Sequence, residues 1–202
     1  MKSFVVTGTD TDIGKTVFAA ALAGAIGARY WKPVQAGWEP ETDSQTVARL
    51  SGVEIVPEAY RLKLAASPHQ AAAAEGIAID TGALMPPSGP VVIEGAGGLM
   101  VPLTRTTLNI DVFAHWGLPL ILCARTSLGT INHTLLSVEA IRAHGIPLTG
   151  IAFIGDENTE SEGVIIEKSG VKRLGRLPRL GSLTRESLAA AFAANFHTED
   201  FA

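Results

Sequence analysis

Short apolar runs bounded by Gly, Pro or polar residues alternate along the chain with longer segments of helical pattern. The runs are typical of buried strands, and they cover Phe4 to Val6, Val91 to Ile93, Leu120 to Ala124 and Ile151 to Ile154. The segments expected to be helices include Thr16 to Ile26, Asn132 to His144 and Ser161 to Lys168. This alternation predicts an α/β fold with a mostly parallel, doubly wound sheet and helices on both of its faces.

Weaker signals add three more elements. Tyr30 to Val34 is expected to be a second strand, with bounds uncertain by several residues. Ser67 and Pro68 suit the N-cap and the first position of a helix that runs to Glu75. The tail from Leu183 to Phe196 has the composition of a final helix.

The composition indicates one globular domain. With 202 residues, 47% of them hydrophobic and 18% charged, the chain can build one core and not two, so we expect residues 1–202 to be a single domain. The net charge of −4 leaves no broad basic surface for nucleic acid or for anionic membrane lipids. Neither a signal peptide nor a membrane span is apparent, which predicts a cytoplasmic protein. Cys123 lies in an apolar run and is expected to be a buried thiol.

The clearest chemical motif is Gly8-Thr9-Asp10-Thr11-Asp12-Ile13-Gly14-Lys15-Thr16, between a strand and an Ala-rich helix. That context is the one a phosphate-binding P-loop needs, although the first glycine stands one place earlier than usual, so the loop is a variant. Backbone N–H groups of such a loop bind phosphate oxygens, Lys15 reaches the outer phosphates and the Thr16 hydroxyl binds Mg²⁺. A plain glycine turn before a helix is the alternative, but strand, spacing and helix together favour nucleotide binding.

Two acidic residues in this loop, Asp10 and Asp12, are unexpected beside phosphates. Each negative charge weakens ATP binding unless a metal, a lysine or a cationic second substrate offsets it. We therefore expect an amine near the loop.

Four motifs in order give a more specific signal than the P-loop alone. The loop Gly8 to Thr16 is followed by Lys32-Pro33-Val34-Gln35-Ala36-Gly37, Ser67-Pro68-His69 and Glu94-Gly95-Ala96-Gly97-Gly98-Leu99. From residue 3 to about residue 180, the chain closely resembles the dethiobiotin synthetases. The resemblance implies a P-loop NTPase-like fold and a ligase reaction in which 7,8-diaminononanoate, CO2 and ATP give dethiobiotin, ADP and phosphate. In that family the reaction passes through a carbamate and a carbamic-phosphoric mixed anhydride, with Mg²⁺ as cofactor.

The resemblance also assigns roles to residues. Lys32, Lys15 and Thr11 match catalytic positions, and Thr16, Asp43 and Glu94 match the metal ligands, a set of oxygen donors that suits Mg²⁺. Lys32 could instead be a surface lysine before a proline, and Asp43 a helix N-cap. The implied nucleotide-binding residues are Asp12, Ile13, Gly14, Lys15, Thr16, Val17, Asp43, Glu94, Gly95, Ala96, Gly97, Gly155, Asp156, Leu177, Pro178 and Arg179. The glycines among them allow close approach of a ligand or a tight turn after the strand.

The diamine site and the assembly are inferred from the resemblance alone. The implied substrate-binding residues are Lys32, Ala36, Gly129, Thr130, Ile131 and Asn132. Family members hold the substrate carboxylate with backbone amides at a subunit interface, which implies a homodimer here. Helix N-terminal amides suit that task, although Asn132 could serve only as an N-cap.

Two positions depart from the family pattern. Ala36 stands where the family usually has Ser or Thr, so one hydrogen bond to the diamine or carbamate is missing, at a cost of about 1 kcal/mol. Gly155 stands where the family often has an Asn that pairs with adenine. Base recognition is therefore expected to be looser and to rely on backbone groups near Gly155 and on Leu177-Pro178-Arg179.

Three other functions fit parts of the sequence. A partitioning or septum-positioning ATPase shares this kind of loop, but its usual early lysine is missing from Thr9 to Thr11. An amidotransferase-linked ligase needs a glutaminase domain for which 202 residues leave no room. An ATP-binding protein with degenerate catalysis is the third alternative. Phosphate release that depends on the diamine separates the synthetase from a switch ATPase, whose hydrolysis should respond to DNA, a membrane or a protein partner.

Overall fold

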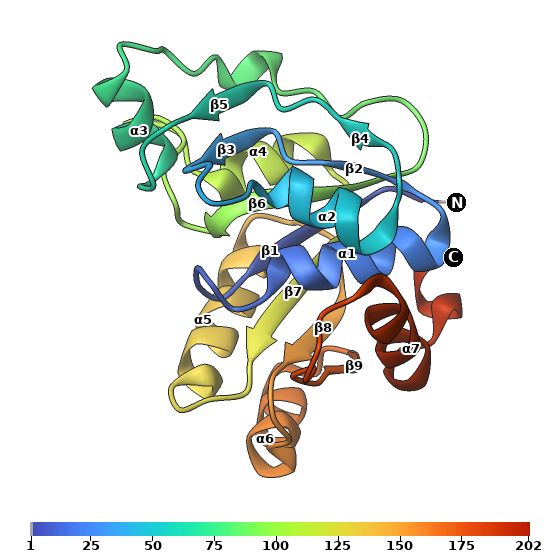
Figure 1. The fold of residues 1–202 in the computed structure, drawn as a ribbon. Coiled ribbons are helices and arrows are strands. Elements are labelled where there is room, and N and C mark those ends of the chain that lie inside the picture. The colour runs from blue at the N-terminus through green and yellow to red at the C-terminus, as the bar shows by residue number, and fades with distance from the viewer. Residues whose placement is uncertain (1) are drawn as a thin grey trace.

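The apolar runs expected to be strands form the centre of a parallel sheet in the computed structural model, which describes residues 2–202 (Figure 1). Its seven strands lie in the order β4-β2-β6-β1-β7-β8-β9, and every pairing between them is parallel. Their bounds are Phe4–Gly8 (β1), Arg29–Trp31 (β2), Ile55–Val56 (β4), Val91–Gly98 (β6), Leu120–Arg125 (β7), Leu148–Ile154 (β8) and Arg173–Leu177 (β9). The predicted α/β class and parallel sheet are confirmed.

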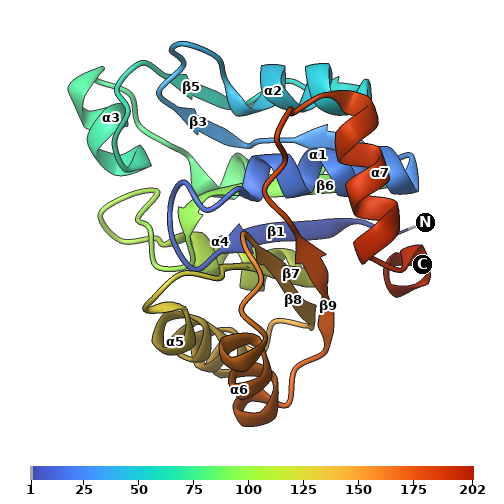
Figure 2. The same cartoon turned by 60° about the horizontal axis from the view of Figure 1, so that its bottom comes forward.

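Helices cover both faces of this sheet (Figure 2). One layer contains α1 (Lys15–Ile26), α2 (Asp43–Ser51) and α7 (Arg185–Asn195), and the other contains α4 (Asn109–Trp116), α5 (Thr130–Ala143) and α6 (Thr159–Ser169). Side chains along β1 alternate between the two hydrophobic cores, one on each face of the sheet. Phe4 and Val6 face the α1 layer, whereas Val5 faces the α5 layer. Both faces of the sheet are therefore buried, as the near-continuous apolar strands require.

The expected second strand, Tyr30 to Val34, is wrong in its bounds. The main-sheet strand β2 ends at Trp31, and β3 (Val34–Ala36) pairs with β5 (Tyr60–Leu62) in a separate two-stranded sheet. Pro33 separates the two strands because it has no N–H to donate to a ladder, while its carbonyl accepts bonds from the segment that leads into β5. The chain thus leaves the main sheet after Trp31, and Lys32 is the first residue beyond the strand.

Helix bounds also differ from the pattern at several ends. The helix expected from Asn132 begins two residues earlier, because Gly129 (φ 94°) caps it in a left-handed conformation that glycine adopts without strain. The alternative that Asn132 is an N-cap is therefore wrong. The expected stop at Gly27 (φ 61°) is confirmed, with its N–H bonded to the Ala23 carbonyl.

The remaining elements lie around this framework. The expected helix after Ser67 is confirmed as α3 (Pro68–Ala74), and short 3₁₀ turns cover Thr81–Ala83 and Thr198–Phe201. Cys123 is a fully buried thiol, as expected. Within residues 2–202, no helix combines the length and apolar character that a membrane span requires.

Candidate functional site

The P-loop joins β1 to α1 at the carboxyl end of the sheet. Gly14 (φ 95°) caps α1, and a Cβ there would lie 2.9 Å from Ile154, so both backbone conformation and space require glycine. The buried Lys15 ammonium donates a 2.7 Å hydrogen bond to the Asp10 carbonyl. Burial is the largest influence on this group and lowers the pKa of Lys15. The loop thus holds a lysine ready to exchange a backbone carbonyl for a phosphate oxygen.

A cluster of four side chains lies next to the loop. The Thr16 hydroxyl oxygen is 2.9 Å from both Asp43 Oδ1 and Glu94 Oε1. Lys32 Nζ lies 2.7 Å from Asp43 Oδ2 and 3.0 Å from Glu94 Oε1. The residues come from α1, α2, β6 and the end of β2, so segments up to 78 positions apart in the sequence meet here. The predicted grouping of Thr16, Asp43 and Glu94 is present, and Lys32 is part of it.

Charge balance in this cluster depends on Lys32. Burial alone lowers the pKa of Lys32, but the adjacent Glu94 and Asp43 carboxylates outweigh it and hold this pKa above its ordinary value. Burial alone raises the pKa of Asp43. The Lys32 ammonium together with the Thr16 hydroxyl outweighs this effect and holds the pKa of Asp43 below its ordinary value. Lys32 is therefore a charged, buried ammonium shared by two carboxylates, and not the surface lysine considered as an alternative.

The bounds of α2 explain how Asp43 reaches this cluster. Thr42 is the N-cap and forms a capping box with Gln45, so Asp43 is the first helical residue. The alternative that Asp43 is itself the N-cap is wrong. Its side chain is free for Thr16 and Lys32 because Thr42 already satisfies the helix end.

The donor set fits Mg²⁺. Octahedral Mg²⁺ with bonds of about 2.1 Å places neighbouring ligand oxygens about 2.9 Å apart, which is the separation of the Thr16 hydroxyl from each carboxylate. Two carboxylates and one hydroxyl are hard oxygen donors and leave positions for phosphate oxygens and water. This arrangement fits a magnesium-nucleotide complex better than zinc, which prefers nitrogen and sulfur ligands.

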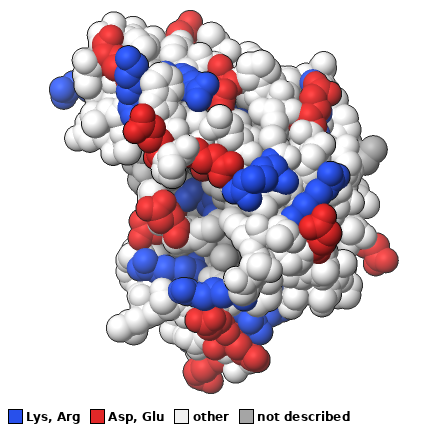
Figure 3. Space-filling model, in the orientation of Figure 1, with Lys and Arg blue, Asp and Glu red and all other residues white. Residues whose placement is uncertain are grey.

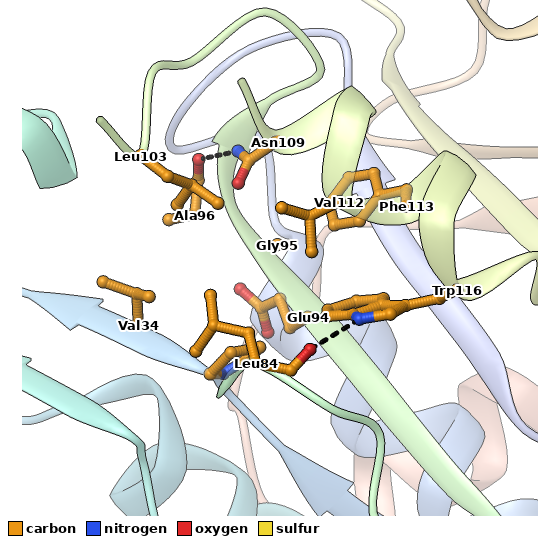
Figure 4. Close-up of a pocket in the computed structure, with 11 residues that line it drawn as sticks. Val34, Leu84, Glu94, Gly95, Ala96, Leu103, Asn109, Val112, Phe113 and Trp116 are labelled. Carbon is orange, nitrogen blue, oxygen red and sulfur yellow. Dashed lines mark hydrogen bonds between the residues drawn. The ribbon is translucent and has the colours of Figure 1, made fainter. Parts of the chain in front are cut away.

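β6 extends beyond the apolar run Val91 to Ile93 that predicted it, so Glu94 lies within the strand. β6 continues through Gly95 and Gly97 to Gly98, and a Cβ on Gly95 would lie 2.6 Å from the Phe113 ring. Packing of α4 against the strand therefore explains this glycine. Figure 4 shows Glu94 and Gly95 beside a cavity of about 10 Å³ next to α4, which has room for one water at most. A nucleotide must lie elsewhere.

Sequence reasoning missed Tyr30 as a member of the site. Its fully buried hydroxyl donates a 2.8 Å hydrogen bond to Glu94 Oε2, which leaves Glu94 Oε1 for Lys32 and Thr16. Burial raises the pKa of Tyr30 well above its ordinary value, so this group stays a donor. The signal was available, because Tyr30 is two residues before Lys32 and alternation along a strand puts both on one face.

Gln35 was also missed, and it bears on the absent hydroxyl at Ala36. The Gln35 side chain accepts a bond from the Asp43 backbone N–H and donates one to the Gly37 carbonyl. The amide oxygen thus holds the start of α2, and the amide nitrogen holds the turn at Gly37. Gln35 does not replace the hydroxyl that the family usually has at the Ala36 position.

A second hollow lies at the same edge of the sheet. Its volume is about 240 Å³, and its lining includes Arg125, Thr126, Asp156 and Arg179. Figure 3 shows the surface hollowed beside the P-loop edge of Figure 1, with side chains of both charges around it. Of the predicted nucleotide contacts, Asp156 and Arg179 line this pocket, and Leu177 adjoins it by accepting a bond from the Gly155 N–H.

Space at Gly155 explains why no side chain is present there. Its φ is +128°, and a Cβ would lie 2.5 Å from the Thr126 hydroxyl. The neighbouring Asn158 does not supply the missing amide, because it already bonds the Thr126 carbonyl and caps α6. Gly155 therefore has no room for a side chain at the position where the family often has an Asn, and the side chain of Asn158 is already bonded on both its oxygen and its nitrogen.

The predicted substrate residues divide into two groups. Lys32 is part of the cluster and Ala36 ends β3, whereas Gly129, Thr130, Ile131 and Asn132 form the cap and first turn of α5. Hydrogen bonds and ion pairs among residues 2–202 do not link this turn to the Lys32 cluster. Leu128, just before it, is 98% exposed, and Leu136 on α5 is 63% exposed.

Thr11 and Val17, also predicted from the resemblance, lie at the two sides of the P-loop. Thr11 is exposed, and its hydroxyl oxygen is 3.3 Å from where a Cβ on Gly97 would lie. Val17 is in the first turn of α1 and packs partly on the core. The P-loop therefore lies close to β6 at Gly97.

Solved structures share this fold. A ParA family ATPase from Chlorobium tepidum superimposes with a TM-score of 0.55 at 11% identity, covering 96% of this chain and 97% of that one. The cell-division ATPase MinD of Pyrococcus furiosus gives 0.54 at 11% identity, covering 96% and 99%. At this identity the likeness concerns the fold alone, and it confirms the P-loop NTPase-like architecture.

Sequence relatives are much more similar. A family model described as "AAA domain" matches residues 2–187. The ATP-dependent dethiobiotin synthetase BioD of a Rhodopseudomonas palustris strain is 65% identical over 99% of this chain and 96% of that protein. The protein of the same name from Sphingopyxis alaskensis is 59% identical over 100% of this chain and 100% of its own length. The one from Agrobacterium fabrum is 62% identical over 98% of this chain and 96% of its own length. The chain therefore belongs to the family of ATP-dependent dethiobiotin synthetases, which are ligases.

Proposed function

We propose that this chain makes dethiobiotin for biotin synthesis from 7,8-diaminononanoate, CO2 and ATP. One substrate amine adds to CO2 and loses a proton, which gives a carbamate. A carbamate oxygen then attacks the terminal phosphorus of ATP, and ADP leaves. The second amine attacks the carbonyl carbon of the resulting mixed anhydride, phosphate departs, and the ureido ring closes.

The arrangement of Lys32 carries this proposal. Its ammonium is held between the Asp43 and Glu94 carboxylates at 2.7 and 3.0 Å, beside the start of α1. A fixed positive charge there stabilises a carbamate and the negative charge that develops during phosphoryl transfer. No covalent nucleophile is needed, because positioning and charge supply most of the catalysis in such transfers.

Thr16, Asp43 and Glu94 are proposed to hold Mg²⁺ together with the nucleotide phosphates. When bound, the ion neutralises charge on the terminal phosphates. Lys15 turns from the Asp10 carbonyl to the outer phosphates, and the loop N–H groups bind the remaining oxygens. Lys32 stays on the substrate side of the cluster and orients the carbamate.

The exposed leucines before and on α5 support a homodimer. Leu128 and Leu136 expose large apolar side chains on the segment that begins with the predicted carboxylate-binding turn, Gly129 to Asn132. A second copy on this face would cover the leucines and complete the diamine site. A cytoplasmic location belongs to the same proposal, because the chain's reaction uses only small molecules and ATP.

Diamine-dependent ATP turnover tests the function. We expect ADP and phosphate to be released only when diamine and CO2 are both present, because the carbamate is the phosphoryl acceptor. A coupled ADP assay, with dethiobiotin measured by mass spectrometry, gives both readouts. ATP hydrolysis that ignores the diamine and responds to DNA or a membrane instead would contradict the proposal and favour a switch ATPase.

Nucleotide selectivity is expected to be loose. The pocket beside Gly155 offers no free side-chain amide to read adenine, because Thr126 fills the space and Asn158 is engaged. We therefore expect turnover with CTP and GTP at saturating diamine to lie within about a hundredfold of turnover with ATP, since one lost recognition bond changes binding by about tenfold. A preference for ATP above a hundredfold would show that other groups read the base.

A further inference from the structure

Arg125 lies between three parts of the site without an assigned role. It is the last residue of β7, which pairs with β1 directly before the P-loop. Its Nη1 is 3.5 Å from Asp10 Oδ2, and its Nη2 lies 3.8 Å from where a Cβ on Gly129 would be. The guanidinium also lines the 240 Å³ pocket at the edge of the sheet.

The contact with Asp10 answers the charge problem in the loop. Asp10 lies in the P-loop, and its other carboxylate oxygen accepts the Thr11 N–H at 2.8 Å. The sequence predicted an amine near the loop, and the cation that the structure places beside Asp10 is instead the guanidinium of Arg125. Because both side chains are one third to one half exposed, this pair adds little to fold stability. Its effect should be on the anion that binds next to Asp10.

A second observation points to a ligand. Arg125 Nε is buried and has no hydrogen-bond partner in residues 2–202, although the same side chain borders the open pocket. A buried charged donor without an acceptor is costly, and such groups normally find a partner when the site is filled. The acceptors that a nucleotide offers are the oxygens of its ribose and phosphates.

We propose that Arg125 is a nucleotide-binding residue, which neutralises Asp10 with its terminal nitrogens and, by a turn of its side chain that brings Nε to the pocket, donates its Nε–H to a ribose or phosphate oxygen of the bound nucleotide. This rests on the proposed ATP site. Arginine suits both tasks at once, since its donors diverge in one plane whereas lysine has a single charged nitrogen. The residue thereby offsets the acidic loop.

Calorimetric titration with ADP and Mg²⁺ tests this proposal. Arg125→Ala should weaken ADP binding by about tenfold or more, the range of a lost charged hydrogen bond. Arg125→Lys keeps the charge but lacks Nε, and its ADP affinity should fall between those of the parent and Arg125→Ala. Adding Asp10→Asn to Arg125→Ala should restore at least about threefold, because the carboxylate left unpaired is removed.

The controls separate the possible failures. Arg142→Ala removes a guanidinium at the far end of α5 and should leave ADP binding unchanged. The melting temperature of Arg125→Ala without nucleotide should differ from that of the parent by only a few degrees. If Arg125→Ala does not fold, Arg125→Gln takes its place. ADP affinities of Arg125→Ala or Arg125→Gln within twofold of the parent would overturn the proposal, and absence of rescue by Asp10→Asn would overturn its Asp10 part. A parent protein that does not bind ADP would instead overturn the proposed function.

Discussion

Replacing Lys32 by Ala is expected to lower turnover by at least about 100-fold while ATP affinity changes by less than about threefold. The ammonium lies between Asp43 and Glu94 and not on the P-loop, so its charge serves the carbamate and the transferring phosphoryl group more than the bound nucleotide. Steady-state rates at saturating diamine, with ATP affinity measured by titration, check both numbers.

The same substitution should also weaken the fold. Without Lys32, the nearly inaccessible Glu94 carboxylate faces Asp43 with no cation between them, and breaking a buried ion pair costs about 3 to 5 kcal/mol of unfolding free energy. Mg²⁺ that binds the two carboxylates should raise the melting temperature of Lys32→Ala more than that of the parent. Lys172→Ala, which removes a lysine paired with Asp200 outside the cluster, is the matched control. Unchanged turnover in Lys32→Ala would falsify the catalytic role.

The central fold could be predicted because its signals are local. Apolar runs such as Leu120 to Ala124 appear as strands in both pattern and structure, since a strand covered on both faces needs nothing else. β9 and α4 lack such a run and were missed. β9 carries Arg173 and Arg176, whose partner Glu162 comes from α6, so only tertiary contacts explain those charges in a strand.

The candidate site divides in the same way. The P-loop could be found because its nine residues are contiguous, and Asp43 and Glu94 because family motifs mark them. Tyr30 and Arg125 belong to no motif, and Gln35 belongs to one that gives its side chain no role. The relevance of all three comes from contacts that form only when the chain folds. Sequence therefore named the groups that could touch substrate, whereas those that orient or neutralise them appeared only in three dimensions.

Glu94→Gln is expected to reduce turnover by at least about 100-fold and to raise the Mg²⁺ concentration needed for half-maximal turnover by at least about tenfold. The amide keeps the size of the side chain but removes the charge that Lys32 and Thr16 share through Oε1. It can accept a bond from Tyr30 only by turning its NH2 group toward Lys32, where two donors then face each other. Rates measured across a Mg²⁺ series give both values.

Glu162→Gln is the matched control for this effect. Glu162 is as inaccessible as a core residue and is bonded by Arg173, so its neutralisation also disturbs a buried ion pair, but in the α6 layer away from Thr16 and Asp43. A general loss of stability would lower the melting temperature of both variants, whereas the Mg²⁺ requirement should change only in Glu94→Gln. Titration of Mn²⁺ with ADP, followed by electron paramagnetic resonance, reports the metal site without turnover. Equal Mn²⁺ affinity in Glu94→Gln and the parent would remove Glu94 from the metal ligands and leave it as the partner of Lys32 alone.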